Sequence, residues 1–244
     1  MLGGFRRRSS LASSRRLSCS PPAPLVDLHL FRSRSFAAGT IGVLISYAML
    51  FGMFFAMSYA FERGYRDLPI IAGLRLTFVP IALGIVAPFA GAVPDRYSKL
   101  VSVSGPVVCG LSALGLISAL SGASHSLPMI MVGLGVYGIG LGVYIASNNN
   151  ETMAAAPVEK SATAGGLLNL LRIFGGAVGV AASTAVLAWH LNAAVGTQVR
   201  TSEAPQAALL AAVDAVLVLL AIFAMIGAAT ALVRDTPPAT RRAN

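Results

Sequence analysis

From Leu100 to Asn150 the sequence contains no Asp, Glu, Lys or Arg. A water-soluble domain does not leave so long a segment uncharged, because about a quarter of its residues are charged. The whole chain is only 11% charged, and its mean hydropathy is +0.76. The segment is too long for one bilayer crossing, which needs about 20 apolar helical residues. Turn-forming residues at positions 121–128, SGASHSLP, divide it in two. The sequence therefore predicts a membrane protein.

Applied to the rest of the chain, the same reasoning predicts an all-α membrane protein with six transmembrane helices. Long, continuously apolar runs favour helices over a closed barrel, whose strands are short and alternate in polarity. We expect a basic tail over residues 1–34, a six-helix bundle over 35–233 and a second tail over 234–244. The six spans are expected at about 36–60, 75–94, 101–120, 128–147, 165–190 and 209–233.

The basic residues of tails and loops predict the orientation, since Lys and Arg are enriched on the cytoplasmic side. The opposite loops hold only Arg63, Arg66 and Arg200. We therefore expect both termini in the cytoplasm and the protein in the plasma membrane. The basic residues on the predicted cytoplasmic side are Arg6, Arg7, Arg8, Arg15, Arg16, Arg32, Arg34, Arg96, Lys99, Lys160, Arg234, Arg241 and Arg242.

Other protein classes fit less well. The first 20 residues are rich in Arg and Ser and lack acidic residues, as in a mitochondrial transit peptide, but a basic cytoplasmic tail is the preferred interpretation. The basic residues form no helix face of the kind that binds nucleic acid. Cys19 and Cys109 have no metal-site spacing. His29, His125 and His190 belong to no catalytic motif, so we expect neither an enzyme nor a cofactor.

Charges within the spans are placed by counting about 20 residues from each boundary. Trp189 is expected in the outer aromatic belt, so Arg172 falls about one turn inside the cytoplasmic interface, where it can reach headgroups. Arg75 and Asp214 fall near the outer boundary. Asp214 is the one carboxylate near a span interior, which makes it a weak candidate for proton coupling, with an interfacial position as the alternative.

Small residues predict close helix packing in the fourth and fifth spans. Gly138 and Gly142 form one GxxxG motif, and Gly175 and Gly179 form another. In the fifth span a small and polar stripe should share one helix face and pack on a neighbouring helix. That stripe consists of Gly165, Asn169, Arg172, Gly176, Gly179 and Ser183.

Three segments resemble one family, the fourteen-spanner drug:proton antiporters of the major facilitator superfamily. PLVDLHLFRSRSFAAG (24–39) resembles the entry to their ninth span. IIAGLRLTFVPIALGIVAPFAGAVPDRYSKL (70–100) resembles the tenth span and the signature loop that follows it. AAAPVEKSATAGGLLNLLRIFGGAVGVA (154–181) resembles the glycine-rich thirteenth span. The resemblance implies the C-terminal six-helix bundle of a major-facilitator fold.

The resemblance also implies roles for individual residues. Gly91, Asp95 and Arg96 match the gating signature loop, although Pro94 and Ser98 depart from its pattern. The acid–base pair of that loop is expected to form charge contacts that close the cytoplasmic side. In the thirteenth span, the residues that match the family's polar pair and its glycines are Asn169, Arg172, Gly175, Gly176 and Gly179.

The expected function is small-molecule or multidrug efflux by proton antiport, in a chain that corresponds to a truncated C-terminal half. Partners would be lipid, protons, a small-molecule substrate (a cationic amphipathic molecule being one option), and an N-terminal half or a second copy. Substrate contacts are expected, from aromatic and Met content, at Tyr47, Met53, Phe54, Tyr137 and Tyr144. The alternative is a non-transporting remnant or partner subunit that needs another chain.

Overall fold

The structure is a computed structural model that describes residues 33–93, 95–121, 127–195 and 205–234. Most of the two expected tails therefore lies outside the described residues. The described chain is all-α, as predicted, and has six helical segments long and apolar enough to cross a membrane. Its elements are α1 (Arg34–Tyr59), η2 (Ala60–Gly64), α2 (Pro69–Leu76), α3 (Phe78–Gly91), α4 (Asp95–Ser121), α5 (Leu127–Ala154), η3 (Val158–Lys160), α6 (Ser161–Val195) and α7 (Gln206–Val233).

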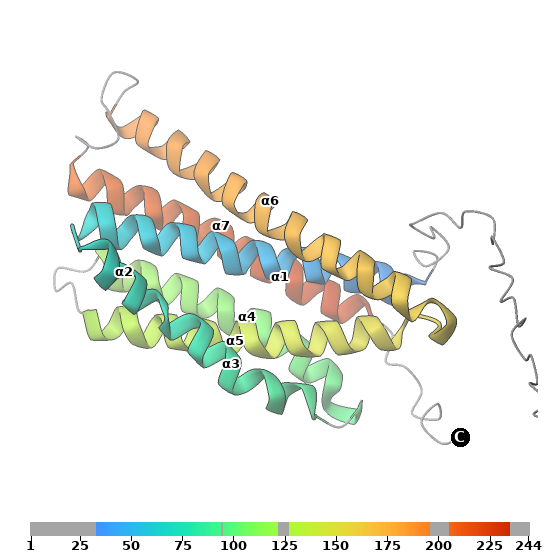
Figure 1. Ribbon diagram of the computed structural model, residues 1–244. Coiled ribbons are helices and arrows are strands. Elements are labelled where there is room, and N and C mark those ends of the chain that lie inside the picture. The colour runs from blue at the N-terminus through green and yellow to red at the C-terminus, as the bar shows by residue number, and fades with distance from the viewer. Residues whose placement is uncertain (1–32, 94, 122–126, 196–204, 235–244) are drawn as a thin grey trace, which may run out of the picture.

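The helices form two rows, which can be followed in Figure 1. In the front row α3 packs on α5, α5 on α1, and α1 on α6. In the second row α4 packs on α5 and α7, and α7 also packs on α1 and α6. We call the end of the bundle where α1 begins and α7 ends the proximal end, and the opposite end the distal end.

Glycines set the spacing within the front row. On α5, a Cβ atom at Gly138 would lie 2.5 Å from the Val79 carbonyl oxygen of α3. A Cβ atom at Gly142 would lie 2.9 Å from the Leu83 carbonyl oxygen of the same helix. On α6, a Cβ atom at Gly175 would lie 2.4 Å from the Leu44 carbonyl oxygen of α1. Both GxxxG motifs thus face the backbone of a neighbouring helix, so each outer helix of the row packs at backbone contact.

The second span is broken at Thr77, between α2 and α3. Pro80 explains the break, because it lacks an N–H group for the carbonyl of Leu76 and its ring crowds that carbonyl. The Thr77 N–H instead contacts the carbonyls of Gly73 and Leu74, at 3.2 and 3.3 Å. This span also begins before the expected position 75, at Pro69, where proline suits the first turn of a helix.

The chain turns sharply between α1 and α2. The last turn of α1 widens into the π-helical segment η2, in which the Tyr65 N–H donates to the Ala60 carbonyl at 2.9 Å. Arg66 then adopts a left-handed conformation with φ 56°, which is unusual for a residue other than glycine. The Asp67 N–H donates back to the Phe61 carbonyl at 3.0 Å. As a result, the Asp67 side chain is carried toward α2.

Candidate functional site

The most connected polar group in the described chain lies at the proximal end. Arg234, the residue that directly follows α7, points into the bundle and is only 5% exposed. Its Nη1 atom donates to Glu151 Oε2 at 3.0 Å. Its Nη2 atom donates to the Ala38 carbonyl at 3.3 Å and also to Asn148 Oδ1. One guanidinium therefore joins the ends of α1, α5 and α7.

Glu151 extends this network to a fourth helix. Its Oε1 atom accepts hydrogen bonds from Ser98 and Ser102 of α4, the latter at 2.6 Å. On the other side, Asn148 Nδ2 donates to the Gly39 carbonyl of α1 at 3.2 Å. We call these residues the proximal cluster: Ser98, Ser102, Asn148, Glu151 and Arg234. The cluster holds α1, α4, α5 and α7 together at one end of the bundle.

Two glycines of α1 make room for the proximal cluster. A Cβ atom at Gly39 would lie 2.3 Å from the Thr152 hydroxyl oxygen. At Gly42 it would lie 2.3 Å from Asn148 Oδ1 and 2.6 Å from Arg234 Nη2. Any larger residue would displace the polar side chains, so the cluster depends on the short GTIG segment at positions 39–42.

The expected signature loop lies beside this cluster. Asn150 Nδ2 donates to the Gly91 carbonyl at 3.1 Å, which ties the end of α3 to α5. Asp95 and Arg96 stand in the first turn of α4, but their side chains lie outside the described residues. Their expected charge contacts therefore stay a prediction.

A second polar group lies at the distal end. Arg75, in the last turn of α2, pairs with Asp67, and its guanidinium carbon lies 5.4 Å from the centre of the Phe61 ring. Burial raises the pKa of the Tyr65 phenol above its ordinary value, and the nearby charge of Asp214 raises it further. Asp214 thus lies close to this distal group, half-buried on α7.

Three of the expected substrate contacts are core residues. Met53, Tyr137 and Tyr144 are fully buried. The Tyr137 hydroxyl donates to the Met49 carbonyl at 3.1 Å, and the Tyr144 ring packs against Gly227. They have no exposed surface in this structure, and their expected substrate contacts stay a prediction. Aromatic and Met content alone does not separate a core residue from one on a pathway.

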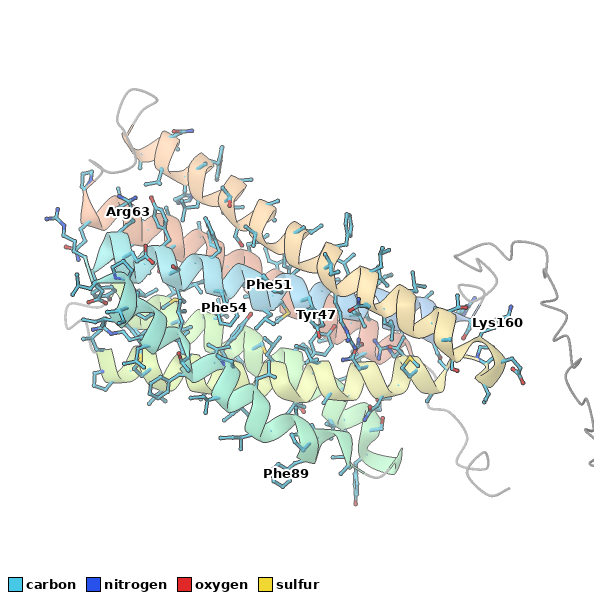
Figure 2. The ribbon with its side chains drawn as sticks, viewed as in Figure 1. Tyr47, Phe51, Phe54, Arg63, Phe89 and Lys160 are labelled. Atoms are coloured by element: carbon cyan, nitrogen blue, oxygen red, sulfur yellow. The ribbon has the colours of Figure 1, made fainter. Side chains whose placement is uncertain are left out.

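The other two expected contacts lie on a partly open side of α1. Tyr47 and Phe54 are half-buried, and Phe51 between them is 42% exposed. The three residues follow one another along α1 in Figure 2. The rings of Phe51 and Phe54 meet edge to face, with centres 6.4 Å apart. We call Tyr47, Phe51 and Phe54 the aromatic strip.

The expected packing stripe of α6 is rotated in its first half. Near the start of α6, Ala164, Leu167 and Leu168 are buried, whereas Asn169 is exposed. A Cβ atom added at Gly165 would have no neighbour within 4 Å. Leucines supply the contact area in this half, so the polar residue is turned outward. In the second half of α6 the small residues are buried, as a packing stripe requires. These buried residues include Gly175, Gly176, Gly179 and Ser183.

Arg172 lies at the edge of that packed side. It is half-buried, and its guanidinium carbon lies 5.7 Å from the centre of the Tyr47 ring. Its Nε atom is buried and has no hydrogen-bond partner in the described chain. The side chain therefore joins α6 to the aromatic strip of α1.

Comparison with known proteins gives the family. Residues 4–180 match the model of the Major Facilitator Superfamily, which is more than half of the chain. The chain belongs to the major facilitator superfamily. Members of this superfamily are transporters rather than enzymes, so the expected absence of a catalytic centre agrees with the family.

Several relatives in the superfamily carry names that refer to drug resistance. The chain is 29% identical to multidrug resistance protein Stp of Mycobacterium tuberculosis over 174 residues, 70% of this chain and 31% of that protein. It is 31% identical to colistin resistance protein EmrB of Acinetobacter baumannii over 195 residues, 78% of this chain and 36% of that protein. It is 28% identical to riboflavin transporter RibZ of Clostridioides difficile over 168 residues, 68% of this chain and 36% of that protein.

Two features of this superfamily member bear on its function. The chain spans about a third of the length of these relatives. Sequence reasoning also misses the proximal cluster, because it places Arg234 in a tail and Glu151 in a loop. The signal that points to the cluster is the run of three asparagines that ends at Asn150. The fourth span is expected to end at 147, but its helix continues through these asparagines to Ala154.

Proposed function

We propose that the chain is one six-helix bundle of an efflux transporter and that it works against a second bundle. The observation that carries this proposal is the uneven burial of the front row. The α2–α3 span and the α6 span are the least buried of the six, and they flank α5 and α1. We call the uncovered side of α3, α5, α1 and α6 the open face. A second bundle facing it would enclose a path for substrate.

In this proposal the two ends of the bundle open alternately, as in transporters that rock one bundle against another. The proximal cluster closes the proximal end by joining four helix ends, and its bonds would break when that end opens. Asp95 and Arg96 would add charge contacts from the first turn of α4. The excess of basic residues around the proximal end supports a cytoplasmic position for it in the plasma membrane.

Proton antiport is the proposed energy source, and Asp214 is the candidate for proton exchange. It is a half-buried carboxylate on α7, close to Tyr65 and to the Asp67–Arg75 pair. An intramembrane carboxylate in such a setting is a functional candidate by default. The relatives' names support multidrug efflux as the activity. The second candidate function is a non-transporting partner subunit. The exposed helices at the edges of the open face would then contact another membrane protein.

Transport by the chain with and without a second bundle tests the proposal. Inverted vesicles would carry the chain alone, the N-terminal bundle of the Acinetobacter relative alone, or both. We expect uptake of a fluorescent drug such as norfloxacin, a flat aromatic carboxylic acid, only with both, and only under a proton gradient. Uptake by the chain alone would require a second copy in place of another bundle. Absence of uptake in every vesicle, with both chains inserted, would favour the non-transporting subunit.

A further inference from the structure

Arg172 is a cation without an anion in the described chain. Arg75 and Arg234, the other two arginines whose side chains are described and not exposed, each pair with a carboxylate. Arg172 pairs with none, and its contact with Tyr47 is a ring contact. A guanidinium within a transmembrane segment is costly unless it is paired. The bundle therefore holds a positive charge that no carboxylate of the described residues neutralises.

The contact between Arg172 and Tyr47 leaves the edges of the guanidinium to an anionic partner. The Tyr47 ring lies near the guanidinium carbon, at 5.7 Å from the ring centre. The N–H groups of a guanidinium lie at its edges, where a planar oxyanion binds with two parallel hydrogen bonds. The buried Nε atom has no partner of its own in the part of the chain that is described. Because Arg172 as a whole is only half-buried, part of its side chain stays open to a ligand beside the aromatic ring.

The site lies well along both helices, away from the segments that precede them. Arg172 is 11 residues after the start of α6, which is roughly 16 Å of helix. Tyr47 is 13 residues after the start of α1, roughly 20 Å of helix. Beyond Tyr47 the aromatic strip continues toward the distal end through Phe51 and Phe54, and no acidic residue interrupts it.

We propose that Arg172 and the aromatic strip form a binding site for a flat aromatic molecule that carries an anionic group. The carboxylate, sulfonate or phosphate of the ligand would lie against the edge of Arg172, and its rings would lie along Phe51 and Phe54. Charge complementarity selects this occupant, because the one charge that the described residues place at the strip is positive. The inference rests on the proposed function, since it names a substrate class for the open face. It differs from the sequence-based option of a cationic substrate.

Equilibrium binding to the purified full chain in detergent tests the site. Three matched probes share one ring system and differ in charge: 2-naphthoate, 2-naphthamide and 2-naphthylmethylammonium. We expect naphthoate to bind at least about tenfold more tightly than the amide, and the ammonium most weakly. Arg172→Gln should remove this preference and leave binding of the amide unchanged. Arg172→Lys should retain part of it.

The matched control is Arg63→Gln, an exposed arginine at the distal end of the bundle, which should leave all three affinities unchanged. Equal binding of the three probes to the unaltered chain would overturn the proposal. So would an equal loss of all three in Arg172→Gln, which would indicate a structural role. Displacement of naphthoate by phosphatidylglycerol but not phosphatidylcholine would assign the guanidinium to a lipid headgroup instead. This experiment measures binding and not transport. The vesicle uptake experiment tests the transport proposal separately, so the failure of one proposal can be told from the failure of the other.

Discussion

Replacing Gly179 by leucine is expected to separate α6 from α1 and leave little folded protein. A Cβ atom at this position would lie 2.2 Å from the carbonyl oxygen and 2.6 Å from the Cα atom of Ala48. These are backbone atoms, so no side-chain rotation can relieve the overlap. Overpacking a core commonly costs about 1–3 kcal/mol, and a clash with backbone belongs at or above the upper end of that range.

Gly166→Leu is the matched control for that variant. It makes the same change in the same helix, at a glycine with nothing within 4 Å of its Cβ position. Both variants gain similar helix propensity, about 1 kcal/mol relative to glycine. Thermal unfolding in detergent should therefore show a large loss of stability for Gly179→Leu and none for Gly166→Leu. Equal melting temperatures for the two variants would contradict the packing of α6 on α1.

Arg234→Ala is expected to have the second large effect, at the proximal cluster. It would leave the Glu151 carboxylate, 17% exposed, without its cation. Removing one member of a buried ion pair typically costs about 3–5 kcal/mol. Here the pair is partly exposed, so we expect a loss near or below the lower figure. The double variant Arg234→Met with Glu151→Met should lose less, because it leaves no unpaired charge.

The measurement is chemical unfolding in mixed micelles, with Arg63→Ala as the control. Arg63 is an exposed arginine at the other end of the bundle, and its removal should change the free energy of unfolding little. If Arg234→Ala were as mild as Arg63→Ala, the cluster would not hold the four helix ends. If the double variant were the least stable of all, the ion pair would not be the reason for the loss.

The six helices were predictable from the sequence because a membrane imposes a simple rule. Each crossing needs a long apolar run, and charges or turn residues mark its ends. The glycines at positions 175 and 179 were also visible, since GxxxG is a local pattern. Which neighbour they would face was not visible, because the partner helix α1 is more than 100 residues away in the chain.

The proximal cluster could not be predicted for the same reason. Arg234 and Glu151 are separated by 83 residues, and each looks like an ordinary charge at the end of a span. Only the packing of α4 against both α5 and α7 brings them together. Burial of the expected substrate-contact residues could not be predicted either. Tyr137 and Tyr144 have the same side-chain chemistry as Tyr47, but helix rotation places two in the core and leaves one partly open.

The central claim is that the open face borders a water-filled path and not lipid. Two residues test it, because their side chains are equally exposed but lie in different rows of helices. Phe51 on α1, in the front row, is 42% exposed, and Val218 on α7, in the second row, is 43% exposed. Phe51 is 17 residues from the proximal end of its helix and Val218 is 15 residues from it, so their depths are similar. Each would be changed to cysteine in a chain with Cys19→Ser and Cys109→Ala, co-expressed with the second bundle of the transport experiment.

The measurement is the rate of reaction with a water-soluble, membrane-impermeant maleimide. A thiol reacts as the thiolate, which forms in water and not in hydrocarbon. The account predicts that Phe51→Cys reacts at least about tenfold faster than Val218→Cys, since only the first would face water. Equal rates at the two positions, or faster reaction at Val218→Cys, would contradict it.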